Sequence, residues 1–217
     1  METQELEKYW NEKHPQQKVI YSGRSIMSSG KLIPLPLDVR VLISANDALL
    51  QQVIEENNLK ADSHDETMWR IQKWVVANLR YVSDEQNEGV LEYWQFPFET
   101  ISLGIGDCED GSLLIASLAL NAGIPSFRVR VSAGFVKPHE ITAPQGGHGY
   151  CTYLRESGDW CAIDWCFYED SSTRMQEKLI FKNNPLYKEV WFSFNNTHSF
   201  TNKEYELSGR VKSKDSK

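Results

Sequence analysis

One segment in the middle of the chain places a cysteine where a glycine-bearing loop meets an apolar helical run. Residues 104–113 read GIGDCEDGSL, with Cys108 at the junction. The first turn of a helix presents unpaired N–H groups and the positive end of the helix dipole, and both favour a thiolate over a thiol. The position of Cys108 therefore favours a reactive nucleophile over a cysteine that only packs.

A thiol nucleophile needs a base, and the base needs a group that orients it. Alternating patterns predict two strands over residues 148–155 and 159–167, joined around residues 156–158. His148 opens the first strand, and Asp164 lies near the end of the second. These two side chains are therefore the candidate partners of the cysteine.

Whether the two partners meet depends on the length of the turn between the strands. A three-residue turn would place Gly158 at the position that favours positive φ. Tyr150 then faces Asp164, and His148 faces Cys166. Because side chains alternate along a strand, His148 and Asp164 would share one face as diagonal neighbours. A two-residue turn would put them on opposite faces, so the sequence predicts the three-residue turn.

The cysteine itself should open a central, buried helix. Apolar residues surround most of the helix predicted over residues 108–121, and Gly123 and Pro125 end it. Upstream, one helix is expected around residues 49–54. The next begins at a capping box formed by Ser63 and Glu66. Its apolar stripe comprises Met68, Ile71, Val75 and Leu79.

Strands follow these helices. Apolar residues of segment 127–131 alternate with Arg128 and Arg130, which predicts a half-buried strand with a solvated basic face. A further strand is expected near residues 190–194. Residues 81–106 are rich in aromatic side chains and are expected to form loops. Helices first and antiparallel strands afterwards indicate an α+β fold.

The order of these residues resembles the transglutaminase-like superfamily of papain-fold thiol enzymes. The resemblance rests on Cys108 within Gly-Asp-Cys-Glu-Asp, then His148, then Asp164 within Ala-Ile-Asp-Trp. Residues 93–100 (YWQFPFET) also resemble the segment before the nucleophile in bacterial and phage-borne members. The resemblance covers roughly residues 63–167. It implies a papain-like core in which the nucleophile helix packs on an antiparallel sheet, with an N-terminal helical extension.

The resemblance also implies roles for individual residues. Cys108 would be the nucleophile, His148 the general base and later the acid, and Asp164 the group that orients the imidazole. The attacked carbonyl would need an oxyanion hole. The backbone N–H of Cys108 is one natural donor, and the side chain of Gln95 or Trp94 is the candidate for the other.

The implied activity is acyl chemistry on an amide of a protein or peptide. Thiolate attack forms a thioester, which water resolves in a peptidase or amidase and an amine resolves in a crosslinking protein-glutamine acyltransferase. We expect hydrolysis by likeness to small bacterial members. A catalytically silent binding module using the same cleft is the alternative from another class, although all three residue types of a triad are present.

The acids and thiols around these residues have plainer interpretations. Glu109 is expected only as a favourable partner of the helix dipole, whereas Asp107 and Asp110 could also brace the active-site loop. Cys151 and Cys161 share the opposite face of the hairpin and are expected in the core.

No metal and no cofactor are expected. Four side chains could in principle ligate zinc, namely Cys108, His148, Asp164 and Cys166, but their dispersed spacing lacks a paired-ligand knuckle. Zinc inhibition of the thiol–imidazole pair is the more reasonable form of such binding. Cys166, opposite His148, is either a packed residue or a second thiol in the cleft.

Composition sets the remaining bounds. The chain has 217 residues, 41% of them hydrophobic, and a net charge of −7. This charge argues against nucleic acid or an anionic membrane as partner. Four cysteines without a CxxC pair indicate reduced thiols. The acidic start, METQELEKYW, differs from a signal peptide, so a cytoplasmic protein is expected, in the host cytoplasm if phage-encoded.

The domain organisation follows from the position of the motifs. Residues 1–60 are expected to form an extension that packs on the core, with a helix over residues 6–13 and an irregular or β-rich arm through residues 39–43. Residues 61–207 would be the catalytic domain, and residues 208–217 a disordered tail. Residues 137–147 hold two prolines and a Gly-Gly pair and are expected to form an exposed loop beside the site.

Overall fold

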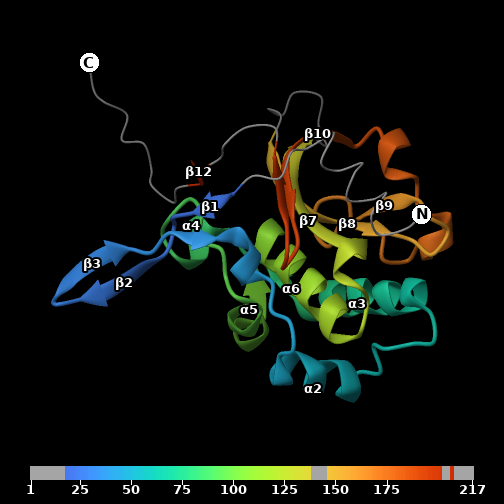
Figure 1. Cartoon of the computed structure of the whole chain (residues 1–217), viewed down its shortest axis with the longest axis horizontal. Coiled ribbons are helices and arrows are strands. Elements are labelled where there is room, and N and C mark those ends of the chain that lie inside the picture. The colour runs from blue at the N-terminus through green and yellow to red at the C-terminus, as the bar shows by residue number, and fades with distance from the viewer. Residues whose placement is uncertain (1–17, 138–145, 202–205, 208–217) are drawn as a thin grey trace.

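A five-stranded antiparallel sheet forms the centre of the fold. The computed structural model describes residues 18–137, 146–201 and 206–207. The strand order is β11-β10-β7-β8-β9, and each neighbouring pair is antiparallel. The strands are β7 (Val129–Val136), β8 (Gly147–Leu154), β9 (Trp160–Ile163), β10 (Tyr187–Phe194) and β11 (Ser199–Thr201). Helix α6 (Cys108–Asn121) packs against β7 and β8 (Figure 1). The predicted α+β fold is confirmed.

Helix α6 is enclosed by the sheet and by other helices because its side chains are apolar on nearly every side. Three helices contact it: α2 (Ala48–Glu56), α3 (His64–Asn78) and α5 (Pro97–Leu103). The helix begins and ends where the sequence predicts. Gly123 follows its end with φ of +96°, a conformation that glycine adopts without strain.

The capping box predicted for α3 is confirmed in its Ser63 half, whereas the Glu66 carboxylate pairs with Arg70 and Arg174. Ser63 Oγ accepts the backbone N–H of Glu66 at 3.1 Å, and the predicted apolar stripe of this helix is buried. The loop expected over residues 81–106 is wrong in part, because it contains α4 (Asp84–Asn87) and α5. Pro97 occupies the first turn of α5, where a missing N–H costs nothing.

The hairpin that carries the candidate partners has the predicted turn. Cys151 pairs with Ile163 and Tyr153 with Cys161, which is the register of a three-residue loop. Gly158 adopts φ of +90° in this loop. The second strand is shorter than the predicted 159–167, because β9 ends at Ile163. Asp164 and Cys166 therefore lie beyond the pairing, and the expected pairs with Tyr150 and His148 are not formed.

The described part of the N-terminal extension is mostly extended chain. Residues 39–43, expected as an irregular or β-rich arm, instead begin with the 3₁₀ helix η1 (Val39–Leu42), which the Asp38 side chain caps. The short strands before it are β1 (Ile20–Tyr21), β2 (Ser25–Ser28), β3 (Lys31–Pro34) and β4 (Leu37–Asp38). The predicted helix over residues 6–13, the middle of the 137–147 loop and the predicted tail lie outside the described residues.

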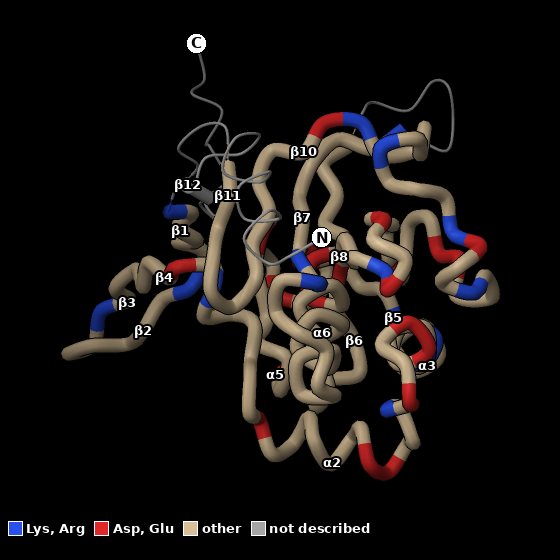
Figure 2. The backbone as a smooth tube through the Cα atoms, turned by 45° about the vertical axis from the view of Figure 1, so that its right-hand side comes forward, with Lys and Arg blue, Asp and Glu red and all other residues tan. Residues whose placement is uncertain are grey.

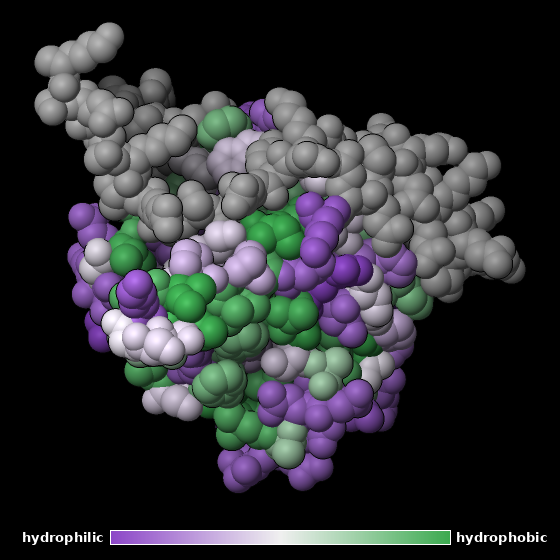
Figure 3. Space-filling model, turned by 60° about the vertical axis from the view of Figure 1, so that its left-hand side comes forward, coloured by the Kyte–Doolittle hydropathy of each residue, from purple (hydrophilic) through white to green (hydrophobic). Residues whose placement is uncertain are grey.

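The β2–β3 hairpin projects from the body of the molecule (Figure 1). Its exposed apolar residues are Ile26, Met27, Leu32 and Ile33. Figure 3 brings this side forward and shows hydrophobic side chains exposed on it. The other short elements are β5 (Arg80–Tyr81), β6 (Ile105–Gly106), η2 (Ser126–Arg128), η3 (Met175–Glu177), η4 (Phe181–Asn183) and β12 (Glu206–Leu207).

The predicted solvated basic face of β7 is wrong for one of its two arginines. Arg130 is only 3% exposed, and its guanidinium lies 3.9 Å from the centre of the Phe200 ring. Sequence alternation could not show this, because Phe200 belongs to β11, which lies two strands away from β7 in the same sheet. Elsewhere, Lys and Arg positions are scattered among Asp and Glu positions in the view of Figure 2. Among the described residues, no helix has the length and apolar character needed to cross a bilayer.

Candidate active site

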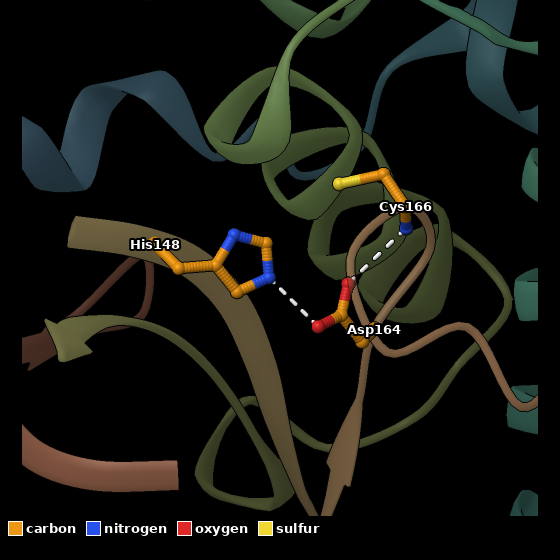
Figure 4. A group of neighbouring side chains, drawn as sticks. All are labelled: His148, Asp164 and Cys166. Carbon is orange, nitrogen blue, oxygen red and sulfur yellow. Dashed lines mark hydrogen bonds and ion pairs between the residues drawn. The ribbon is translucent and has the colours of Figure 1, made fainter. Parts of the chain in front are cut away.

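The two predicted partners of the cysteine meet at the edge of the sheet. His148 Nε2 and Asp164 Oδ2 lie 2.7 Å apart, and their side chains are only 4% and 1% exposed. Figure 4 shows the imidazole of His148, on β8, directed at the carboxylate of Asp164, which follows the end of β9. The three-residue turn contributes to this, because it sets the register of β8 and β9 and so fixes where Asp164, the residue after β9, lies relative to β8.

Asp164 is held by more than the imidazole. Its Oδ1 accepts the backbone N–H groups of Cys166 and Phe167 at 3.1 and 3.2 Å. Its Oδ2 also accepts the N–H of Tyr168 at 3.2 Å and the hydroxyl of Tyr187 at 3.1 Å. Burial alone would raise the pKa of Asp164. The hydrogen bonds from His148 and the backbone outweigh that effect and hold this pKa below its ordinary value.

A buried glutamine connects this end of the sheet to helix α3. Gln72 is fully buried, and its Nε2 donates to the backbone oxygen of Asp164 at 2.7 Å and to Asp170 Oδ1 at 3.0 Å. Neither Gln72 nor Tyr187 was singled out in the sequence. Each is an ordinary polar residue within an apolar pattern, and only the packing of distant segments brings it to Asp164.

Cys108 lies at the start of α6, with its thiol between the helix and strand β8. The Gly149 N–H donates to Cys108 Sγ at 3.3 Å, and the thiol donates to Glu109 Oε2 at 3.1 Å. Burial raises the pKa of the Cys108 thiol well above its ordinary value, and the charges of Glu109 and Asp107 raise it further. Burial and the neighbouring acids therefore oppose the effect that the helix terminus is expected to have on this thiol.

Cys108 and His148 line the same cleft. This cleft, the Tyr81 cleft, has a volume of about 360 Å³. Its lining consists of Tyr81, Cys108, Val136, Gly146, Gly147, His148, Cys166 and Phe167. A second hollow of about 350 Å³, the Glu92 cleft, is also lined by Cys108 and His148 and continues toward Glu92, Trp94 and Trp191. Space for a substrate therefore extends to two sides of the cysteine.

Two glycines allow the backbone to approach the nucleophile closely. A Cβ at Gly111 would lie 2.2 Å from Nε1 of Trp165, whose N–H donates to the carbonyl of Cys108 at 3.2 Å. A Cβ at Gly149 would lie 3.1 Å from the backbone of Glu109. Glycine is required at position 111 because any side chain there overlaps the indole.

Of the two candidate oxyanion side chains, only Trp94 lines a described cleft with Cys108. Its indole N–H already donates to Glu92 Oε2 at 3.2 Å. Gln95 is 1% exposed and lines neither the Tyr81 cleft nor the Glu92 cleft. The backbone N–H of Gln95 donates to Asp110 Oδ1 at 2.7 Å, so this residue is tied to the loop before α6.

Asp110 connects two segments that precede the cysteine. Besides Gln95, it accepts the backbone N–H of Asp107 at 3.1 Å through Oδ2. Asp110 is fully buried, whereas Asp107 is 9% exposed and belongs to the same group of acids. A residue that braces the loop before α6 would make these two backbone contacts, as predicted for Asp110.

The acids around Cys108 form a cluster that sequence reasoning missed. Its members are Asp84, Glu92, Asp107, Glu109 and Asp110, which fall into overlapping groups of three with carboxylate oxygens within 4.8 Å of one another. Burial, followed by mutual repulsion, raises the pKa of Asp84 to about 7. Glu109 lies in the first turn of α6, as its predicted role as a partner of the helix dipole requires, and it is only 6% exposed, so its carboxylate also belongs to this buried cluster. The signal in the sequence was the density of acids around one cysteine.

The other three cysteines divide between the core and the Tyr81 cleft. Cys151 and Cys161 are fully buried in the core, as predicted. Cys166 is partly exposed and lines the Tyr81 cleft. Its Sγ, a ring nitrogen of His148 and a carboxylate oxygen of Asp164 lie within 4.8 Å of one another (Figure 4).

Comparison with known proteins agrees with this architecture. A family model described as a transglutaminase-like domain matches residues 50–136, a range that includes Cys108 and stops before His148. No curated protein sequence gives a significant match.

Solved structures of LapG from Legionella pneumophila share the fold. The calcium-bound form has a TM-score of 0.53 at 20% identity, covering 76% of this chain and 82% of that one. The EGTA-treated form has a TM-score of 0.53 at 19% identity, covering 71% and 84%. Residues 50–136 are therefore similar to the transglutaminase-like domain family, and the chain as a whole shares the fold of LapG.

Proposed function

We propose that this protein is a thiol-dependent hydrolase of amide or peptide bonds that works through Cys108, His148 and Asp164. The observation that carries the proposal is the buried His148–Asp164 pair at 2.7 Å, in a cleft that also contains the thiol at the start of α6. A buried carboxylate fixes the orientation and tautomer of an imidazole. Burying a carboxylate costs free energy, and a protein that only binds its ligand gains nothing from an oriented imidazole in return.

The proposed reaction follows from this arrangement. His148 donates Nε2–H to Asp164, which leaves Nδ1 to accept the proton of the Cys108 thiol. The thiolate attacks the substrate carbonyl, and the negative oxygen that forms is stabilised by the backbone N–H of Cys108. His148 then protonates the leaving amine. Water attacks the resulting thioester, releases the acid and regenerates the thiol.

The raised pKa of Cys108 makes the thiol dependent on a base. A thiol held protonated by Glu109 and burial needs the imidazole as a partner before it can react, so thiolate formation depends on the His148–Asp164 pair. Transfer to an amine instead of water would make the protein an acyltransferase, and the choice depends on which acceptor enters the cleft.

Thiol labelling tests the proposal. Under reducing conditions, iodoacetamide should modify Cys108 ahead of the other three cysteines, and His148→Ala should slow that modification. A quenched protein substrate should then be cleaved by the natural chain and not by Cys108→Ala. Incorporation of a labelled amine would indicate the acyltransferase. Labelling that is fast and unchanged in Cys108→Ala would refute the catalytic proposal and favour a binding module.

We also propose that the acidic cluster beside Cys108 binds calcium. A LapG structure with this fold is described as calcium-bound, and carboxylate oxygens are the ligands that calcium prefers. The residues fit such an ion, because Glu109 Oε1 and Asp107 Oδ1 are buried without a hydrogen-bond partner among the described residues. A bound cation would offset the repulsion among five neighbouring carboxylates and would withdraw Glu109 from the Cys108 thiol.

Thermal unfolding in calcium and in EGTA tests this second proposal. Calcium at about 100 times its dissociation constant stabilises a protein by about 2.7 kcal/mol, which for this size raises Tm by roughly 5–11 °C. Glu109→Gln should remove the calcium effect and stabilise the calcium-free protein, because one repelling charge is lost. Glu85→Gln, an exposed acid of α4, is the matched control. An equal calcium shift in Glu109→Gln would contradict the assignment.

A further inference from the structure

The carboxylate of Asp164 is held mainly by its own segment of chain. The backbone N–H groups of residues 166–168 donate to it, and Figure 4 shows the first of these bonds. Among the described residues, only two side chains donate to this carboxylate, those of His148 and Tyr187. The Tyr187 hydroxyl lies 3.1 Å from Oδ2. Tyr187 therefore holds the carboxylate from outside its own segment and takes no part in the proposed proton transfers.

Tyr187 reaches Asp164 from another part of the sheet. It lies on β10, paired with Val136 of β7, whereas Asp164 follows the end of β9, and β9 and β10 are not neighbours. Tyr187 is only 8% exposed, and the centre of its ring lies 4.5 Å from that of Tyr150 on β8. A ring packed in this way keeps its hydroxyl in one place. The hydroxyl therefore fixes where Oδ2 lies relative to the sheet.

Tyr187 and His148 donate to the same carboxylate oxygen. Oδ2 lies 2.7 Å from His148 Nε2 and 3.1 Å from the Tyr187 hydroxyl. A donor that stabilises the charge of a carboxylate leaves less of that charge to stabilise a protonated imidazole. Burial, followed by the charge of Asp164, raises the pKa of Tyr187 above its ordinary value, so the phenol stays protonated and remains a donor near neutral pH.

Other titratable groups also face the pair. Tyr150 and Cys151 lie on β8, and the segment after β9 supplies Cys166, Tyr168 and Asp170, the last paired with Lys178. The start of α6 supplies Asp107, Cys108 and Glu109. A substitution at position 187 leaves all of these groups in place. The difference between such a variant and its parent therefore reports the Tyr187 hydroxyl.

We propose that Tyr187 is a positioning residue: its hydroxyl fixes Asp164 Oδ2 and weakens this oxygen as a partner of protonated His148, so that the imidazole is free to accept a proton at lower pH. Without the hydroxyl, Asp164 stabilises the protonated imidazole more strongly, and a higher pH is needed to remove the extra proton. The carboxylate also turns more freely. The consequence for catalysis rests on the proposed hydrolase function, whereas the effect on the imidazole does not.

Nuclear magnetic resonance of His148 measures the effect without substrate. The imidazole is titrated in Cys108→Ala, which removes the neighbouring thiol, at constant calcium. Addition of Tyr187→Phe should raise the titration midpoint by roughly half a unit to one unit, a 3–10-fold higher proton affinity. Tyr150→Phe is the matched control. The Tyr150 hydroxyl is buried without a hydrogen-bond partner among the described residues, so its removal should leave the midpoint unchanged.

A second variant tests the sign of the effect. Tyr187→difluorotyrosine keeps the ring and makes its hydroxyl a stronger donor, so the midpoint of His148 should fall instead of rise. Because the ring stays in place, this variant also tests the proposal if Tyr187→Phe is too unstable to titrate. A midpoint that rises in the fluorinated variant would contradict the proposal.

The pH dependence of hydrolysis connects the hydroxyl to the reaction. In Tyr187→Phe, the acid limb of the kcat/KM profile should move to higher pH by the same amount, roughly half a unit to one unit. Looser orientation of the imidazole should also lower kcat at the plateau about tenfold without a change in KM. Tyr150→Phe should retain the profile of the natural chain.

The outcomes separate this proposal from the hydrolase. An equal midpoint of His148 with and without Tyr187→Phe would overturn the role of Tyr187, whatever the activity. An equal shift in Tyr150→Phe would overturn it as well, because a looser aromatic cluster would then be the cause. A shift specific to Tyr187→Phe, in a protein that cleaves no substrate, would retain the effect on His148 and refute the hydrolase.

Discussion

Gly111→Ala tests whether the close approach of Trp165 to α6 maintains the site. The new Cβ would lie 2.2 Å from Trp165 Nε1, and ordinary contact begins at 3.4 Å, so the indole must move by about 1.2 Å. Movement of the ring would also weaken the hydrogen bond from Nε1 to the Cys108 carbonyl, now 3.2 Å long. Trp165 directly follows Asp164, so the displacement reaches the carboxylate that orients His148.

Opposing contributions decide whether Gly111→Ala raises or lowers the free energy of unfolding. Alanine is favoured over glycine within a helix by about 1 kcal/mol. Overpacking of a buried site costs about 1–3 kcal/mol, and the weakened hydrogen bond costs about 1 kcal/mol more. The cost of the steric overlap and of the weakened hydrogen bond outweighs the gain in helix propensity. We therefore expect Gly111→Ala to lower the free energy of unfolding by roughly 1–3 kcal/mol. Misplacement of catalytic groups by about 1 Å should also lower kcat/KM roughly 100-fold.

Urea denaturation and hydrolysis assays measure the two effects. Gly146→Ala is the matched control for stability, because a Cβ there meets nothing within 4 Å, and its free energy of unfolding should change by less than about 0.5 kcal/mol. In the double variant Gly111→Ala/Trp165→Phe, the smaller ring should relieve the overlap, so the combined loss should be smaller than the sum of the two single losses. If Gly111→Ala were as stable and active as the natural chain, the close packing of Trp165 on Gly111 would not be what maintains the site.

Three further predictions concern the polar contacts. Asp164→Asn should lower kcat roughly 10³–10⁴-fold in a folded protein, because an amide holds the wrong tautomer of His148; a loss below about tenfold in the hydrolysis assay would exclude the orienting role. Tyr187→Phe removes the hydroxyl that donates a hydrogen bond to Asp164. The free energy of unfolding, measured by urea denaturation, should fall by about 1.5–3 kcal/mol, and an unchanged midpoint would contradict this. Burial would raise the pKa of Glu99, but its hydrogen bonds from Arg24, both 2.7 Å long, hold it below its ordinary value. The unfolded chain then binds more protons in acid, so this stability is lost as pH falls below about 4.5, and Glu99→Gln should flatten that part of the stability curve measured by denaturation.

Local patterns were sufficient for the regular elements near the site. The limits of α6 follow from its apolar run and from Gly123, and the start of α3 follows from Ser63 and Glu66. The register of the hairpin follows from Gly158, because a three-residue loop needs a residue that tolerates positive φ. These signals lie within a few residues of the structure that they determine. For this reason the sequence by itself was enough to predict that His148 and Asp164 lie close together.

Tertiary structure alone decided the environments. The burial of Arg130 depends on strands far along the chain, and the acidic cluster depends on α4 and the loop after it returning to the start of α6. The thiol of Cys108 lies at the helix terminus that the sequence predicted, yet the acids and the burial around it reverse the expected direction of its pKa. A local pattern sets backbone conformation through short-range sterics and hydrogen bonds. Desolvation and charge depend on every segment that packs nearby, so no local pattern contains them.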